Sequence, residues 1–182
     1  MNQPPRAVVL FFHGYGSYGG KYGFVAKHWA EQGFDFVTYD YCGFGKSDGM
    51  PGYIDSQQSL IDDAFNFVQK AREFYGPDVK FFALGLSMGG AISLTLSRYD
   101  PSIFVGLLLV APFIRMARVP PGTFLLKCLA CLCPRWALIS VGEPSERYKP
   151  MYMDPQVYKG KSRLGTLNVL MGLANLVNRN MT

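Results

Sequence analysis

Four short apolar runs, each followed by a turn or a segment of helical character, limit the folds open to this sequence more than any other feature. The runs are rich in Val, Phe, Leu and Ile and span residues 7–12, 34–39, 79–84 and 104–111. Runs of this length are typical of strands buried on both faces of a sheet. The segments of helical character between them span residues 20–32, 55–75 and 87–99. Strict alternation of strand and helix predicts an α/β fold, with right-handed crossovers and a parallel sheet flanked by helices.

The pattern changes after Pro112. Pro120-Pro121-Gly122 breaks the chain, and two or three apolar helical pieces follow with no further convincing strand. Pro and Gly together interrupt regular structure, so the second part is predicted to be a helical excursion laid over the sheet. We therefore expect a core with an incomplete sheet over residues 1–112 and a helical cap or lid over residues 113–182.

Composition and charge favour a folded globular domain and argue against a nucleic-acid-binding protein. The 182 residues are 49% apolar and 17% charged, and the formal net charge is +5. The Lys and Arg residues are scattered and form no run of five or six, which indicates a generally basic surface that tolerates anionic membrane faces. We expect no nucleic-acid partner.

The cysteines and the apolar segments bear on localisation. Cys42 stands alone, whereas Cys128, Cys131 and Cys133 form a cluster with no fourth zinc ligand nearby; we expect apolar packing in a reduced compartment, with reversible acylation as the alternative, and no metal. No charged-then-apolar leader opens the chain, and the apolar stretch at 123–133 is too short to span a bilayer. The sequence predicts a cytoplasmic or peripheral membrane protein.

The strongest chemical signal is Gly85-Leu86-Ser87-Met88-Gly89-Gly90, which directly follows the third apolar run and opens a helical segment. The pattern G-x-S-x-G between strand and helix is a nucleophile elbow, a strained turn that lifts a serine Oγ clear of the sheet. The flanking glycines, Gly85 and Gly89, are needed because side chains there would clash. The pattern predicts Ser87 as a catalytic nucleophile.

A second signal is His13-Gly14-Tyr15-Gly16, at the end of the first apolar run. In α/β-hydrolases this loop supplies one backbone N–H of the oxyanion hole, and the residue after the nucleophile supplies the other. Those donors would be Tyr15 and Met88. We expect His13 to hold the loop by a hydrogen bond rather than to act as a general base, and Gly14 to support the same motif.

An alternative interpretation of this loop is a dinucleotide-binding fold. Gly14-Tyr15-Gly16-Ser17-Tyr18-Gly19 also fits G-x-G-x-x-G after a strand, and Asp40 ends the next strand where such a fold places its ribose-binding acid. This alternative leaves the elbow at Ser87 unexplained, and His13 precedes the glycines. In the favoured interpretation no cofactor is expected.

Three motifs in order resemble the monoacylglycerol lipase group, also described as serine aminopeptidase S33 or lysophospholipase-like. They are His13-Gly14-Tyr15-Gly16, the loop Tyr39-Asp40-Tyr41-Cys42-Gly43-Phe44-Gly45-Lys46-Ser47-Asp48-Gly49, and the elbow around Ser87. The resemblance continues through Leu109-Val110-Ala111-Pro112 and Asp154-Pro155-Gln156-Val157-Tyr158-Lys159-Gly160. It implies an α/β-hydrolase core, a serine esterase activity on monoacylglycerols or lysophospholipids, and a lid after Pro112 that roofs an acyl-chain tunnel. Apolar residues of that lid would face lipid or substrate, for example Phe124, Leu125, Leu126 and Leu129.

The acid and the histidine of a catalytic triad are not recognisable in this chain. In this fold the triad runs Ser, then Asp or Glu, then His, but the two histidines, His13 and His28, both precede Ser87. Of the carboxylates after Ser87 that we considered, Asp100 and Asp154 each precede a proline and are expected at turns, and Glu143 follows no candidate strand. The resemblance implies that family members begin with further strands and continue past the cap, so the chain is expected to be truncated at both ends.

Three explanations of this pattern remain open. The chain could be a fragment of an active lipase, a short form that binds lipid or a partner without turnover, or one piece of a split enzyme. Unpaired sheet edges promote association, which favours a protein partner that covers the missing strands.

Overall fold

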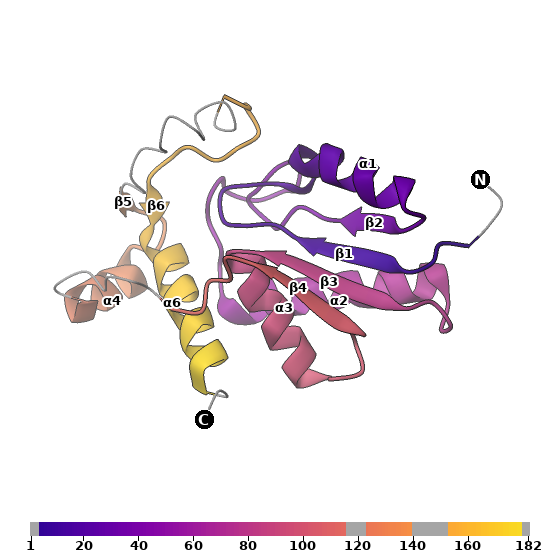
Figure 1. The fold of residues 1–182 in the computed structure, drawn as a ribbon. Helices are drawn as coiled ribbons and strands as arrows, with labels where there is room; N and C mark the ends of the chain where they lie inside the picture. Colours follow the sequence, from indigo (N-terminus) through magenta and orange to yellow (C-terminus); the bar gives the residue numbers. More distant parts are fainter. Residues whose placement is uncertain (1–3, 116–122, 140–152, 180–182) are drawn as a thin grey trace. The chain divides into compact units, whose positions relative to one another are not determined.

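The computed structural model describes residues 4–115, 123–139 and 153–179 (Figure 1). Its elements, in chain order, are β1 (Val8–Phe12), the 3-10 helix η1 (Gly19–Tyr22), α1 (Gly23–Glu31), β2 (Asp35–Thr38), α2 (Gln57–Tyr75), β3 (Phe81–Leu86), α3 (Met88–Tyr99), β4 (Gly106–Val110), α4 (Thr123–Leu132), β5 (Ala137–Ile139), β6 (Ser162–Arg163) and α6 (Leu164–Arg179). The chain divides into two compact units. The first contains Met1–Tyr15, Gly19–Tyr39 and Ile61–Phe113, and the second contains Gly16–Tyr18, Asp40–Leu60 and Ile114–Thr182.

The first unit is built on a four-stranded parallel sheet with the order β2-β1-β3-β4. In this register Val8 lies opposite Asp35 on one side and Phe81 on the other, and Phe82 lies opposite Gly106. All four strands fall within or close to the apolar runs of the sequence. The predicted α/β class, with a parallel sheet flanked by helices, is confirmed.

Neighbouring residues of β1 show how helical elements cover both faces of this sheet. Successive side chains of a strand point to opposite faces. Phe11 lies against Tyr22 of η1, with ring centroids 4.6 Å apart, whereas Phe12 lies edge-on to Phe67 of α2 at 5.8 Å. All five residues of β1 are buried. Figure 1 shows α1 on one side of the strands and α2 and α3 on the other.

The expectation that every strand is buried on both faces is wrong for β4. Among the described residues this strand pairs only with β3, and Leu108, Leu109 and Val110 are 36%, 36% and 50% exposed. The strand is apolar throughout, and it forms an edge of the sheet in the described part of the chain. Its composition is that of a central strand, but its position is that of an edge strand.

Two details of the expected secondary structure also need correction. The helix expected over residues 20–32 is divided into η1 and α1. The expectation of no further strand after Pro112 is wrong, because β5 and β6 form an antiparallel pair. Strands of two or three residues are too short to produce a period-two pattern in the sequence.

The second unit is held together by contacts between its loops and the segment that contains β6 and α6. Thr166, which is fully buried on α6, donates a hydrogen bond from Oγ1 to the Gly52 carbonyl and accepts one from the Ile54 N–H. The Tyr158 N–H donates to the Gly16 carbonyl at 2.8 Å. A Cβ on Gly52 would meet the Tyr158 ring, so this glycine allows the ring to pack directly on the loop.

The predicted boundary at Pro112 stays a prediction, and the compact units divide the chain between Phe113 and Ile114. The units also group residues 16–18, residues 40–56 and the first turn of α2 with the later segment. The expectation of apolar packing is wrong for three of the cysteines, because the side chains of Cys42, Cys128 and Cys131 are exposed.

In the ranges that the structure describes, no helix is long and apolar enough to cross a membrane.

Candidate active site

Ser87 occupies a sharp turn between the last residue of β3 and the first residue of α3. Its backbone has φ 51° and ψ −113°, a conformation that costs about 1–3 kcal/mol and persists only where the surroundings enforce it. Ser87 stands at the N-cap position of α3, yet its side chain makes no capping hydrogen bond. The Ser87 hydroxyl therefore does not cap the N-terminus of α3.

The glycines around Ser87 permit close approach of three backbone segments. A Cβ on Gly89 would lie 1.9 Å from the carbonyl oxygen of Phe12, so α3 starts directly against the end of β1. A Cβ on Gly85 would lie 2.6 Å from the Cα of Gly90. Any side chain at these positions would push the strand and the helix apart and would open the turn.

The loop after β1 lies beside Ser87. A Cβ on Gly14 would be 3.4 Å from the Cβ of Ser87, which places the peptide that links Gly14 to Tyr15 next to the serine. Met88 is the first residue of α3 and is 1% exposed. The first N–H groups of a helix have no partner within the helix and carry its positive dipole end. Gly14, which precedes Tyr15, thus lies beside Ser87, and Met88 directly follows it. The roles of Tyr15 and Met88 as donors of the oxyanion-hole N–H groups stay a prediction.

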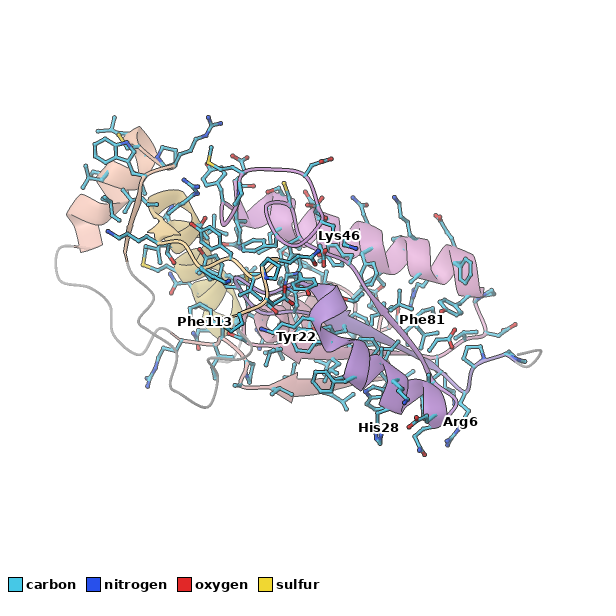
Figure 2. All side chains as sticks on the ribbon, turned by 90° about the horizontal axis from the view of Figure 1, so that it is seen from above. Arg6, Tyr22, His28, Lys46, Phe81 and Phe113 are labelled. Carbon is cyan, nitrogen blue, oxygen red and sulfur yellow. The ribbon has the colours of Figure 1, made fainter. Side chains whose placement is uncertain are left out.

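His13 is fully buried, and its Nδ1–H donates a hydrogen bond to the Gly14 carbonyl at 2.9 Å. The hydrogen bond expected of this residue is present, and it fixes the loop at the position next to Ser87. His28 is exposed on α1. Figure 2 shows it on α1, away from Phe113, which is the third residue after β4.

The carboxylates considered as triad acids have other roles or lie outside the described residues. Asp100 accepts hydrogen bonds from the Ser102 N–H and Oγ, and the bond to that hydroxyl is the main reason why its pKa is lowered. Asp154 accepts a 2.5 Å hydrogen bond from the Tyr18 hydroxyl. This hydrogen bond, together with burial, raises the pKa of Tyr18 to about 12. Glu143 lies outside the described residues, as do the side chains of Phe124, Leu125 and Leu126, whereas Leu129 is half-buried.

The geometry also bears on the dinucleotide alternative. The glycine loop leads into η1 rather than into the first turn of an α-helix, and α1 begins only at Gly23. The carboxylate of Asp40 accepts the Lys46 N–H at 2.9 Å and closes its own loop. Among the residues with described positions, no three His, Cys, Asp or Glu side chains gather as metal ligands would.

The sequence interpretation missed the backbone partners of Ser87. Its N–H donates to the Val110 carbonyl at 3.0 Å, and its carbonyl accepts the Phe113 N–H at 2.9 Å. Both partners belong to the Leu109-Val110-Ala111-Pro112 segment or directly follow it. That segment is part of the family resemblance, but nothing in its sequence indicates that it forms hydrogen bonds with the backbone of Ser87.

Comparison with known proteins gives sequence relatives of several kinds. A monoglyceride lipase homolog of Monkeypox virus is 29% identical over 185 residues, which cover 96% of this chain and 65% of the relative. Monoglyceride lipase of Mus musculus is 34% identical over 60% of this chain and 36% of its own length. Phospholipase YtpA of Bacillus subtilis is 36% identical over 59% of this chain and 41% of its own length. The chain spans about two thirds or less of these relatives.

Solved structures share the fold. Monoacylglycerol lipase of Paleococcus ferrophilus matches with a TM-score of 0.78 and 23% identity, over 97% of this chain and 68% of that one. A monoglyceride lipase from Saccharomyces cerevisiae, solved with a substrate analog, matches with a TM-score of 0.79 and 21% identity, over 100% and 63%. The family model described as serine aminopeptidase, S33, matches residues 3–182. The chain therefore belongs to the serine aminopeptidase S33 family of α/β-hydrolases.

Proposed function

We propose that this chain carries the nucleophile and the oxyanion hole of a serine hydrolase that cleaves carboxylic esters of lipids. The observation that carries the proposal is the strained backbone of Ser87 at the junction of β3 and α3, next to Gly14 of the β1 loop. Ser87 is partly buried, and such strain at a strand-to-helix turn is typical of a nucleophile held ready for attack. The lipase and phospholipase names of the relatives favour monoacylglycerols or lysophospholipids as substrates.

In this proposal the Ser87 Oγ attacks the ester carbonyl carbon and the carbonyl oxygen becomes negative. The Tyr15 and Met88 N–H groups stabilise that oxygen, the bond to the glycerol oxygen breaks, and the alcohol leaves with a proton. Water then releases the fatty acid from Ser87. A base must take the serine proton in the first step, and no histidine follows Ser87 in these 182 residues.

We further propose that additional polypeptide covers β4 and supplies the missing base and acid, either from the same protein or from another chain. An apolar edge strand with exposed Leu108, Leu109 and Val110 is a ready template for a further strand. The intact mass of the protein from its native source, with peptide mapping after Thr182, tests this origin. A downstream Asp and His would identify one continuous enzyme, whereas a 20.3 kDa mass without a co-purifying chain would refute the proposal of added strands.

Hydrolysis of defined lipids by the native protein tests the substrate class. Release of fatty acid from a monoacylglycerol or a lysophospholipid, abolished by Ser87→Ala, is the expected result. Cleavage of neither lipid by a protein that contains the full triad would contradict the proposed substrates.

A second candidate function is an inactive lipid-binding or assembly subunit. The observation in its favour is that His13 is fully buried with its Nδ1 bonded to Gly14, while His28 is exposed on α1. A protein that binds a radiolabelled monoacylglycerol but neither cleaves it nor reacts with a serine-directed fluorophosphonate would support this candidate. Covalent reaction at Ser87 would exclude it.

We also propose peripheral membrane contact through the second unit. Leu132 on α4 and Trp136 and Leu138 around β5 are 79%, 55% and 50% exposed, and Arg135 beside them is also exposed. Apolar side chains next to a cation favour an anionic lipid surface. Trp136→Ala with Leu138→Ala is expected to lower co-sedimentation with phosphatidylserine vesicles several-fold. Phe74→Ala, at an 82% exposed aromatic residue of α2, is the matched control, and an equal loss in both variants would contradict the proposal.

A further inference from the structure

The last residue of β4 and the segment that follows it hold both peptide groups of Ser87. The Ser87 N–H donates to the Val110 carbonyl at 3.0 Å, and the Ser87 carbonyl accepts the Phe113 N–H at 2.9 Å. The angles φ and ψ of a residue describe rotations of these same two peptide groups about its Cα. The Ser87 carbonyl also accepts the Gly90 and Ala91 N–H groups of α3, at 3.0 and 3.3 Å. The two hydrogen bonds from residues 110–113 therefore restrain both angles of the nucleophile together with the start of the helix. We call residues 110–113 the clamp.

The clamp depends on an unusual backbone conformation at Ala111. In the part of the chain that the structure describes, two non-glycine residues have a positive φ: Ser87 at 51° and Ala111 at 43°. Alanine adopts this region rarely, and a residue before proline is normally extended. Ala111 thus carries strain of the same kind as the nucleophile, and it does so at the point where the chain reverses between Val110 and Phe113.

The contacts of Pro112 show what enforces the positive φ of Ala111. Pro112 packs on the first turn of α3, where a Cβ on Gly90 would lie 2.8 Å from the proline Cβ and 2.9 Å from its Cα. The ring of Pro112 also fixes its own φ, which stiffens the segment between the two hydrogen bonds. The side chain of Ala111 is exposed. The contribution of Ala111 therefore comes from its backbone and not from core packing.

We propose that Ala111 is a positioning residue: its left-handed backbone lets residues 110–113 hold Ser87 in the elbow conformation that attack on an ester requires. This inference rests on the proposed function of Ser87 as nucleophile. It adds a residue from outside the elbow motif to the set that determines the reactivity of the serine.

Substitutions at Ala111 separate a positioning role from a general effect on stability. Ala111→Val introduces a β-branched side chain that strongly disfavours a positive φ, whereas Ala111→Gly adopts this φ without steric cost. Ile103→Val shortens a residue that is 1% exposed just before β4, and it serves as a destabilised control that leaves the clamp intact.

Two readouts test the proposal, one on the full 182-residue chain and one on the native protein with its triad complete. The first is amide hydrogen exchange of the Ser87 and Phe113 N–H groups by NMR, and the second is the rate of covalent labelling by a fluorophosphonate. Ala111→Val is expected to speed exchange of the Phe113 N–H at least tenfold beyond the Ile103→Val control and to slow labelling at least tenfold. The conservative Ala111→Gly is expected to stay within about threefold of the native chain in both.

Several outcomes overturn the inference. Equal Phe113 exchange in Ala111→Val and Ile103→Val would show that the clamp does not depend on Ala111. Faster exchange with an unchanged labelling rate would show that the clamp does not position Ser87. A native protein with a complete triad that never reacts with the probe would refute the nucleophile itself, and the exchange of the Ser87 and Phe113 amides would still decide whether Ala111 holds the clamp.

Discussion

Replacing Gly89 by alanine places one methyl group where α3 meets the end of β1. The added Cβ would lie 1.9 Å from the Phe12 carbonyl oxygen, 2.4 Å from the Phe12 carbonyl carbon and 2.8 Å from the His13 carbonyl oxygen. All three atoms belong to the backbone of a fully buried strand and its adjoining residue, so no side-chain rotation can relieve the collision. The start of α3 must move by about 1.5 Å before the nearest contact reaches an ordinary 3.4 Å.

The size of the effect follows from this geometry. Overpacking a core usually costs about 1–3 kcal/mol, and collision with rigid backbone belongs at the upper end or beyond. We therefore expect Gly89→Ala to lower the free energy of unfolding by at least about 3 kcal/mol. The matched control is Gly23→Ala at the start of α1, where a Cβ would meet nothing within 4 Å. Its effect is expected to stay within about 0.5 kcal/mol.

Urea unfolding followed by tryptophan fluorescence measures both values. The chain has two tryptophans, Trp29 on α1 in the first unit and Trp136 in the second. A Trp136→Phe background leaves Trp29 as the reporter for the unit that contains the elbow. The m-values of the two alanine variants must agree before their free energies are compared. A Gly89→Ala variant as stable as Gly23→Ala would refute the close approach of α3 to β1.

Two further predictions concern the second unit. Because the hydrogen bond to Asp154 raises the pKa of Tyr18 from 10 to about 12, the folded chain holds this proton more tightly than the unfolded chain. Stability is therefore expected to fall as pH rises from 10 to 12, and Tyr18→Phe, compared by thermal unfolding across this window, should reduce that slope. Thr166→Val removes a fully buried hydroxyl that bonds both Gly52 and Ile54 and is expected to cost about 1–3 kcal/mol in urea unfolding. Thr166→Ser, which keeps the hydroxyl, should recover most of that loss; equal losses would contradict the role of the two hydrogen bonds.

The sequence was sufficient for the alternation of strands and helices and for the location of Ser87 between them. Four apolar runs separated by helical segments leave few arrangements other than a parallel sheet. The elbow motif carries its own structural context, because glycines on both sides of a serine are required only where the backbone turns sharply. These features are local, and local patterns are what a single sequence records most clearly.

The features that could not be predicted depend on contacts between distant residues. An apolar run such as Leu107-Leu108-Leu109-Val110 has the same letters at an edge as in the centre of a sheet. Thr166 is separated from Ile54 by 112 positions, so no window of the sequence relates them. Ala111 gives no signal of its positive φ, because alanine is common in every kind of secondary structure, and only the surrounding fold enforces it.

The most direct test of the account is covalent labelling of the native protein by a fluorophosphonate, followed by peptide mass spectrometry. The account predicts one modified site, Ser87 in the peptide that joins β3 to α3, and no modification in a Ser87→Ala variant. Absence of the adduct from Ser87, under conditions in which the monoacylglycerol lipase of Paleococcus ferrophilus is labelled, would contradict the assignment of Ser87 as a nucleophile.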